Sequence, residues 1–269
     1  MAIITISRGS YSRGKDVAEK VAHRLGYACI SRDIVLDASE IFNVPELKLG
    51  RAIHDAPSLL DRFSYGKERY IAYIQAALLK LFREDNVVYH GLAGHFFVQG
   101  IRHALKVRIT ADMEDRVRLE MARKNIPAKE ALHLLREDDE QRRRWSQWLY
   151  GIDTRDPNLY DLVLHLKHLT ADDAADIICR AVRLDRFRTT EESRQTMKDL
   201  ALAAQVRAAL VEKVPDVNVS CDHGDIHIAA KANVLSQEKL TADLTNTAAL
   251  VGGVKAVDVQ VEPMILFDD

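Results

Sequence analysis

The segment Gly9–Lys15 has the residue types and spacing of a phosphate-binding loop. It reads Gly-Ser-Tyr-Ser-Arg-Gly-Lys, which fits the pattern G-x-x-x-x-G-K. A short β-branched run precedes it and helical periodicity follows it, which is the context that the pattern requires. In such a loop, backbone N–H groups and the positive end of a helix dipole attract phosphate oxygens. Lys15 would then neutralise charge on the β- and γ-phosphates.

The residue after the lysine is Asp16, where the pattern has Ser or Thr to contact Mg²⁺. A carboxylate can also bind Mg²⁺, although it adds negative charge beside the phosphates. The alternative to a nucleotide site is an ordinary Ser- and Gly-containing turn into a helix. With ATP and Mg²⁺ as ligands, the expected contacts are Gly9, Ser10, Tyr11, Ser12, Arg13, Gly14, Lys15 and Asp16.

Three consecutive arginines begin at Arg142 and directly follow a group of acidic residues. Phosphoryl transfer needs cations on the equatorial phosphate oxygens, and an arginine on a mobile lid can supply one. The alternative is a solvated helix face with the i,i+4 ion pairs Asp138–Arg142 and Asp139–Arg143. The pattern alone leaves both interpretations open.

Further candidate residues follow predicted strands or lie on predicted helices. Asp33 either contacts an acceptor or caps a helix that starts at Ile34. His90 ends a predicted strand, where α/β sheets bind ligands, but a hydrogen-bonded structural histidine is the alternative. Arg116 and Arg123 lie seven residues apart on one predicted helix. They could point at phosphate, but we expect both to be exposed.

The elements that position these residues alternate between strand and helix over residues 1–183, which predicts a parallel, doubly wound α/β sheet. Helix 127–150 has Trp145, Trp148 and Leu149 on one face, which we expect to pack in the core, with a base-stacking role as the alternative. Asp112 is predicted to cap helix 113–124. The predicted strands are 2–7, 87–89, 106–109 and 159–166, and the other predicted helices are 17–25, 68–83 and 171–182.

The remainder of the chain has a different organisation. Residues 184–196 are polar and are predicted to form a linker or an exposed helix extension. Residues 197–262 follow the order α-β-β-α-β, with a hairpin turn at Asp222–Asp225 and a helix break at Gly252–Gly253. Residues 263–269 are predicted to be a C-terminal tail.

Composition excludes several classes of protein. The 269 residues are 47% apolar and 29% charged with a formal charge of −2, which is typical of a globular protein and gives no indication of nucleic-acid binding. The three cysteines are far apart, and the ten histidines include no compact ligand set, which disfavours disulfides and a zinc site. The sequence shows neither a signal peptide nor an apolar run of ~18 residues, so we expect a cytoplasmic protein without a membrane span. Its oligomeric state is not indicated.

The N-terminal part resembles the cytidylate kinase-like family of P-loop kinases. The resemblance begins with Ile4–Arg8, Ser12–Lys15 and Leu25–Tyr27, and an acidic residue often stands in the family where Asp16 does. It continues over about residues 1–182 through Arg32-Asp33, Val87–Gly94, Lys106–Arg116, Asp139–Arg142 and Tyr160–Val163.

The resemblance implies a P-loop kinase-like parallel sheet flanked by helices with a helical lid. It implies roles for Lys15 and Arg142 in catalysis and for Asp33, His90 and Gly91 on the acceptor side. Leu92 stands where the family has arginine, in a neighbourhood that helps to recognise the base. The resemblance therefore implies a nucleotide or another small acceptor rather than CMP in particular.

The C-terminal part, about residues 197–262, resembles a BON domain, a small α/β unit of bacterial proteins. That family is associated with binding of phospholipids or other ligands, so peripheral phospholipid contact is one expectation.

The sequence is consistent with two functions. The first is ATP-dependent phosphoryl transfer to a small acceptor. The alternative is a catalytically weak nucleotide-binding sensor whose C-terminal unit binds a ligand, phospholipid or partner, and Tyr11, Asp16 and Leu92 motivate it.

Overall fold

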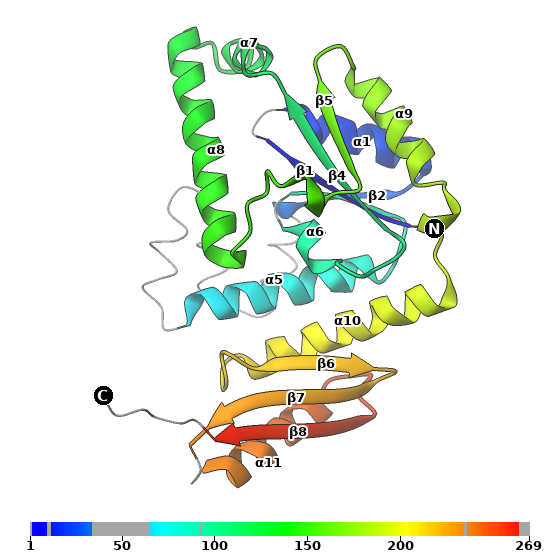
Figure 1. Cartoon of the computed structure of the whole chain (residues 1–269), viewed down its shortest axis with the longest axis vertical. Coiled ribbons are helices and arrows are strands. Elements are labelled where there is room, and N and C mark those ends of the chain that lie inside the picture. Colours follow the sequence, from blue (N-terminus) through cyan, green and yellow to red (C-terminus); the bar gives the residue numbers. More distant parts are fainter. Residues whose placement is uncertain (1, 10–11, 34–64, 92, 234–235, 264–269) are drawn as a thin grey trace.

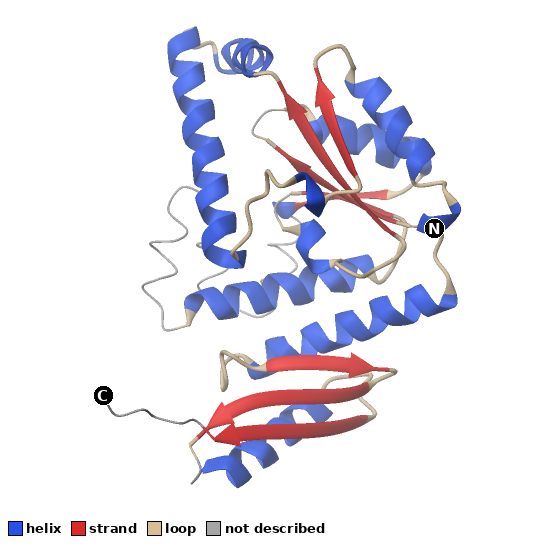
Figure 2. Cartoon of the chain, viewed as in Figure 1, coloured by secondary structure: helices blue, strands red, loops and turns tan. Residues whose placement is uncertain are grey.

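The structure is a computed structural model that describes residues 2–9, 12–33, 65–91, 93–233 and 236–263 (Figure 1). It contains two units, each built on its own sheet (Figure 2). Among the described residues, no helix is both long and apolar enough to cross a bilayer.

The N-terminal unit is built on a parallel sheet of five strands in the order β2-β3-β1-β4-β5. Its central strand is almost entirely buried, as expected of a short apolar run in a sheet covered on both faces. The predicted parallel α/β fold is therefore confirmed. The strands are β1 (Ile3–Arg8), β2 (Ala28–Ser31), β3 (Val87–His90), β4 (Ala104–Ala111) and β5 (Leu162–Leu166).

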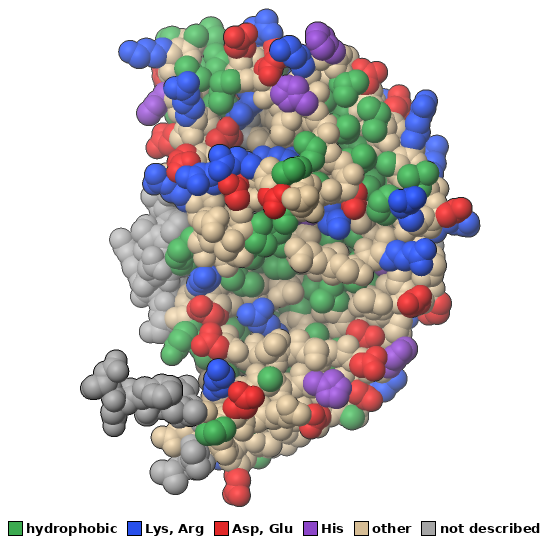
Figure 3. Space-filling model, in the orientation of Figure 1, with side chains coloured by type: hydrophobic (Ala, Val, Ile, Leu, Met, Phe, Trp, Pro, Cys, Tyr) green, Lys and Arg blue, Asp and Glu red, His purple; other side chains and the backbone are tan. Residues whose placement is uncertain are grey.

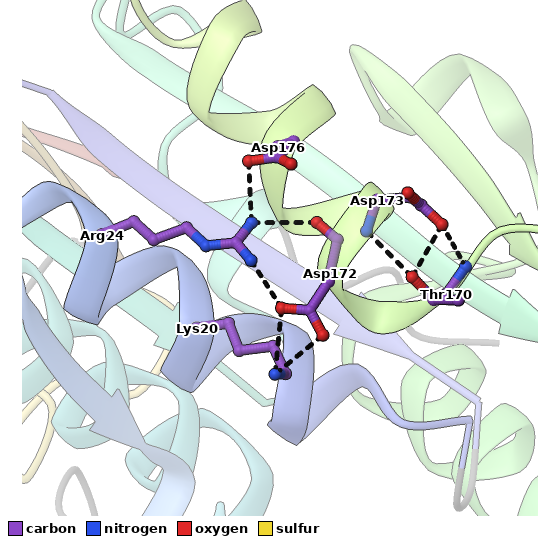
Figure 4. Close-up of polar contacts among 6 residues, drawn as sticks. All are labelled: Lys20, Arg24, Thr170, Asp172, Asp173 and Asp176. Carbon is purple, nitrogen blue, oxygen red and sulfur yellow. Dashed lines mark hydrogen bonds and ion pairs between the residues drawn. The ribbon is translucent and has the colours of Figure 1, made fainter.

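Helices α1 (Gly14–Leu25) and α9 (Ala171–Ala181) cover one face of this sheet. Ion pairs join them, because Asp172 contacts both Lys20, at 3.0 Å, and Arg24 (Figure 4). Thr170 and Asp173 form a capping box at the start of α9. The opposite face carries α5 (Gly66–Phe82) and α6 (Gly94–Phe97).

A helical hairpin of α7 (Met113–Lys124) and α8 (Ala128–Tyr150) extends beyond the carboxyl end of β4 (Figure 1). The C-terminal end of α8 packs in the same core as α5, where Trp145 and Leu149 are buried as predicted and Trp148 is partly buried. Asp112 precedes α7, but its side chain makes no capping hydrogen bond. Its carboxylate instead binds His165, at 3.0 Å, and Lys167, at 2.7 Å, because His165 lies in the adjacent strand β5 and Lys167 directly follows that strand.

The C-terminal unit has the predicted order of elements. Strands β6 (Asn218–Asp222) and β7 (Asp225–Ala232) form the antiparallel hairpin, and β8 (Ala256–Pro263) pairs parallel to β7. Helices α10 (Glu191–Leu210) and α11 (Gln237–Ala249) pack against one face of this sheet.

Residues 184–196, predicted as a linker or helix extension, contain the short helix η3 (Asp185–Phe187) and the start of α10. A capping box between Thr190 and Ser193 begins α10. Ser193 is buried, so this polar segment forms an ordered helix start although it has no apolar periodicity.

Candidate functional site

The loop after β1 is tied to the carboxyl end of β4. The amide of Gly9 donates to the carbonyl of Ile109 at 3.3 Å. The Ser12 hydroxyl lies 3.0 Å from the carbonyl of Gly9 and 3.2 Å from that of Ile109, and the Ser12 side chain is buried. The loop is therefore anchored at the edge of the sheet where α/β proteins bind ligands. Ser10 and Tyr11 lie outside the described residues.

Backbone geometry explains why glycine stands at the start of α1. Arg13 adopts a left-handed conformation with φ of 59°, and the helix begins at the next residue. A Cβ atom on Gly14 would lie 2.6 Å from Cβ of Arg8, which is closer than such atoms approach. A glycine at this position lets the positive end of α1 pack directly on the end of β1.

Lys15 and Asp16 occupy the first turn of α1 and are exposed. The Lys15 ammonium lies 3.6 Å from the Glu19 carboxylate. Both residues line a cavity of about 520 Å³ beside the loop, to which Arg8 and Arg13 also contribute. Lys15 therefore lies beside the predicted loop, where its ammonium pairs with Glu19 of the same helix.

A second cavity, of about 310 Å³, lies between the loop, β4 and α8, and we call it the arginine cavity. Gly9 and Ser12 line it on the loop side, and Arg8 borders both cavities. Seven of its fourteen lining residues are arginine, namely Arg8, Arg108, Arg116, Arg136, Arg142, Arg143 and Arg155. Figure 3 shows blue side chains in a band that crosses α8 toward the middle of this face. Guanidinium groups in this number favour an anion with several oxygens, such as a phosphate chain.

Arg142 lines the arginine cavity, as the lid interpretation requires. Its Nε atom lies 3.2 Å from Asp138, so the predicted i,i+4 pair is present as well. The predicted pair between Asp139 and Arg143 is wrong, because Arg143 binds Glu140 at 2.6 Å. Asp139 points instead toward the neighbouring helix α7.

The prediction that Arg116 is exposed is wrong. Its side chain is only 8% exposed and its guanidinium lies 2.8 Å from Asp139. The reason is the packing of α7 against α8, which turns Arg116 inward toward the arginine cavity. Arg123, two turns later, is exposed as predicted and pairs with Glu120.

A hydrogen-bonded network that sequence reasoning missed supports the wall of the arginine cavity. The Arg108 guanidinium donates to the carbonyl of Thr154 and lies 3.3 Å from the Tyr160 hydroxyl. That hydroxyl also lies 2.9 Å from the Thr154 carbonyl and 3.2 Å from the Ser7 hydroxyl. The Tyr160 ring stacks against the buried ring of His95, with centroids 4.7 Å apart. No sequence spacing connects these residues, because they come from four separate segments.

His90 is buried at the carboxyl end of β3, and its Nδ1 atom has no hydrogen-bond partner among the described residues. The expected structural hydrogen bond is therefore not found at this atom. Burial and the nearby Arg8 guanidinium lower the pKa of His90, and Lys15 acts in the same direction. Glu19 and Asp33 act in the opposite direction. His90 thus lies within electrostatic reach of both the loop lysine and Asp33.

Gly91 allows a close approach between β3 and the end of β2. A Cβ atom on Gly91 would lie 2.4 Å from the Tyr89 hydroxyl and 3.3 Å from Cβ of Arg32. Asp33 is exposed, while the helix that it was predicted to cap lies outside the described residues, as does Leu92.

Arg32, which sequence reasoning did not select, lies among aromatic rings beside these residues. Its guanidinium is 5.2 Å from the ring centre of Trp145 and donates to the Tyr70 hydroxyl at 3.3 Å. Tyr70 meets Trp145 edge-on, with centroids 5.3 Å apart. The indole N–H of Trp145 has no partner among the described residues, although its side chain is buried. The signal available in the sequence was the position of Arg32 directly before Asp33.

The structure thus brings the predicted residues together in two groups. Gly9, Ser12 and Arg142 share the arginine cavity, whereas Lys15 and Asp16 line the adjoining one. His90 and Asp33 line neither of these two cavities. Over the described ranges there is no cluster of three or more His, Cys, Asp or Glu side chains that could hold a metal ion.

The N-terminal part of the chain is similar in sequence to known proteins. The sequence model of the cytidylate kinase-like family matches residues 3–168. A cytidylate kinase from Archaeoglobus fulgidus is 29% identical over 191 residues, covering 70% of this chain and 99% of that protein. A cytidylate kinase from Sulfolobus acidocaldarius is 25% identical over 178 residues, covering 65% and 91% of the two chains.

Among solved structures, an uncharacterized protein from Eubacterium ventriosum superposes with a TM-score of 0.54 at 18% identity. The match covers 68% of this chain and 99% of that protein, and it supports the fold alone. The family match ends at residue 168, before α9 and the C-terminal unit.

Proposed function

The chain belongs to the cytidylate kinase-like family, and from this premise we propose that it transfers the γ-phosphoryl group of ATP to a nucleotide or another small acceptor. The observation that carries the proposal is the arginine cavity. One side of this cavity is formed by Gly9 and Ser12 of the phosphate-binding loop, and the other by Arg142 and Arg116 of the helical hairpin. A phosphate chain held by the loop would therefore face guanidinium groups from a separate element.

Positioning and charge stabilisation are what this chain supplies to the reaction. The backbone amides of the loop and the ammonium of Lys15 hold the donor phosphates. Arg142 sits on α8, outside the sheet, where a small movement of the hairpin would bring it onto the transferring group. Arg116, fixed by Asp139 at 2.8 Å, supplies a second cation from a buried position.

Asp16 is the residue that fits a divalent metal accompanying ATP. Mg²⁺ is usually bound by one or two carboxylates together with phosphate oxygens and waters, so a single exposed carboxylate beside Lys15 is an adequate protein contribution. When bound, the metal would neutralise charge on the phosphate oxygens. A dedicated cage of protein ligands is not needed for this role.

On the acceptor side we propose His90, Gly91 and Asp33, with Arg32 as an addition from the structure. The lowered pKa keeps His90 neutral near pH 7, so its unpaired Nδ1 can form a hydrogen bond with a polar ligand atom. Arg32, which lies against the buried Trp145 ring and the Tyr70 hydroxyl, offers a cation to an acceptor. Because Leu92 departs from the family pattern, the base of the acceptor is to be identified by a screen of nucleotides.

An acceptor screen tests this function. ADP formation from ATP is measured alone and with CMP, UMP, AMP or GMP in turn. We expect at least one acceptor to raise the rate by about tenfold or more, and Arg142→Ala to lower that rate by ~100-fold because it removes a transition-state cation.

The matched control is Arg144→Ala, on the same helix but 67% exposed and outside the arginine cavity. Its rate is expected to stay within about twofold of wild type, as is usual for an exposed ion pair. ADP formation that none of the four nucleotides changes would refute phosphoryl transfer to these acceptors. An Arg142→Ala rate equal to that of the control would refute the role of Arg142.

The alternative, a nucleotide-binding sensor, has one observation in its favour. The ammonium of Lys15 pairs with Glu19 at 3.6 Å and does not line the arginine cavity. Tight ATP binding without acceptor-dependent turnover in the same screen would favour this role.

We propose that residues 197–262 are a BON-like unit, which the order α10-β6-β7-α11-β8 supports. The exposed face of its sheet includes Asp222, Asp225, Asp258 and Glu262 with Lys231. This acidic character disfavours contact of that face with anionic phospholipid.

A further inference from the structure

Helix α10 belongs to two hydrophobic cores at once. One of its faces, with Ala201, Ala204 and Ala208, is buried in the same core as α5 and Trp145. Another face, with Val206 and Leu210, is buried against the sheet of the C-terminal unit. The C-terminal unit therefore packs directly behind the helix that borders the acceptor side, beyond the part of the chain that the family match covers.

Polar contacts from the end of α10 fix α5 at two adjacent turns. One oxygen of the Glu212 carboxylate accepts a hydrogen bond from the Tyr73 hydroxyl at 2.6 Å, and the other lies 2.7 Å from the Arg69 guanidinium. A third contact joins Arg207 to Gln75 at 3.4 Å. A carboxylate with two partners on one helix restricts both the rotation and the sliding of that helix.

The neighbouring residue on α5 contacts the acceptor side. Tyr70 directly follows Arg69, and its hydroxyl accepts a hydrogen bond from Arg32 at 3.3 Å. Its ring also meets Trp145 edge-on, and Trp145 in turn packs under the Arg32 guanidinium. Because the helix moves as a rigid body, a displacement of Arg69 and Tyr73 would also displace Tyr70.

We infer that Glu212 of the C-terminal unit is a positioning residue for the acceptor side: through Arg69 and Tyr73 it fixes α5, and α5 orients Arg32. The inference rests on the proposed function, because that function assigns Arg32 to the acceptor. In this role the C-terminal unit would contribute to the reaction without binding a ligand itself.

The test uses the full chain and the only two tryptophans in it. In a Trp148→Phe background, all indole emission comes from Trp145. Glu212→Ala and Tyr73→Phe are compared with Glu238→Ala, an exposed glutamate on α11 of the same unit. Acrylamide quenching of Trp145 is measured first without ligand, and binding of CMP and of ATP with Mg²⁺ is then titrated separately.

We expect Glu212→Ala to weaken CMP binding about fivefold and to leave ATP binding within about twofold of wild type, a loss in keeping with removal of a partly exposed pair. Where CMP is turned over, its KM should rise while kcat changes little. Tyr73→Phe should act in the same direction with a smaller effect, and Glu238→Ala should change neither. Trp145 should become more accessible to acrylamide only in the first two variants.

Unchanged CMP binding and unchanged quenching in Glu212→Ala would overturn the inference, and so would equal losses for CMP and ATP. If CMP neither binds to nor is turned over by the wild type, CMP fails as an acceptor, and the quenching comparison alone judges the role of Glu212. If Glu212→Ala does not fold, the conservative Tyr73→Phe variant decides by the same criteria.

Discussion

Arginine side chains dominate the chemistry of the site, and contacts within the protein hold several of them in place. Arg116 is paired with Asp139, Arg143 with Glu140, and Arg108 with the carbonyl of Thr154. A buried cation needs such a partner, because an unpaired charge away from water is costly. The pairing keeps the guanidinium groups oriented toward the arginine cavity before any ligand arrives.

Because His95 is buried, we expect the stability of the protein to depend on pH. Burial, with help from Arg108 and Lys106, lowers the pKa of His95 to about 3. The unfolded chain takes up this proton near pH ~6.5, so the folded state loses up to ~1.4 kcal/mol per pH unit from that value down to the folded pKa. Denaturant unfolding of wild type and His95→Gln at about pH 7 and about pH 5 measures the difference. We expect the variant to lose less of its unfolding free energy, and equal losses would contradict this.

Sequence reasoning identified the loop residues but not the orientation of most arginines. The loop is a local pattern, and its context of strand and helix could be deduced from adjacent residues. Arg116 and Arg123 illustrate why the orientations could not be predicted. A spacing of seven residues places both on one side of a helix but does not indicate where a neighbouring helix packs. Only the contact of α7 with α8 separates the buried arginine from the exposed one.

At the scale of elements, hydrophobic periodicity predicted nearly every strand and helix of both units. Strand β2 and the short helix α6 were not predicted, and other differences lie at ends that local polar contacts determine. Strand β5 begins at Leu162 and not at 159, because Asp156 accepts a hydrogen bond from the amide of Asn158 and starts the short helix η2 (Pro157–Leu159). The start of α10 was missed because its capping residues, Thr190 and Ser193, lie in a polar stretch without apolar periodicity.

At the junction between β1 and α1, Gly14 leaves no room for a side chain. Gly14→Ala places a methyl group 2.6 Å from Cβ of Arg8, so α1 must shift away from the end of β1. We expect a loss of ~1–3 kcal/mol in the free energy of unfolding and weaker ATP binding. Gly252→Ala is the control, since nothing lies within 4 Å of the added atom, and it should cost less than about 0.5 kcal/mol. Equal stabilities of the two variants in denaturant unfolding would contradict the packing argument.

At the scale of the whole molecule, α10 makes the two units interdependent. Its residues complete the core behind α5 and also that of the C-terminal sheet, so neither core is complete when α10 is displaced. The order of the elements in each unit could be predicted from the sequence, but this sharing could not. No pattern in the sequence of α10 indicates that it packs against α5 as well as against the C-terminal sheet. Tyr73 and Glu212 are separated by 139 positions in the chain.

This sharing predicts cooperative unfolding of the full chain. Both tryptophans belong to the N-terminal unit, so their fluorescence reports that unit, whereas far-ultraviolet circular dichroism reports both. We expect the two thermal transitions to coincide, as in a two-state system. A separate earlier transition seen only by circular dichroism would mean that the C-terminal unit unfolds on its own.

A thermal-shift titration with ATP and Mg²⁺ tests directly whether the loop Gly9–Asp16 is a working nucleotide site. At ~100 times its dissociation constant a ligand adds ~2.7 kcal/mol, which would raise the Tm of a chain of this size by about 5–10 °C. We predict this rise for wild type and for the control Lys80→Ala, an exposed lysine on α5, and its loss in Lys15→Ala. No rise in wild type, or the same rise in Lys15→Ala, would mean that this loop does not bind ATP through Lys15.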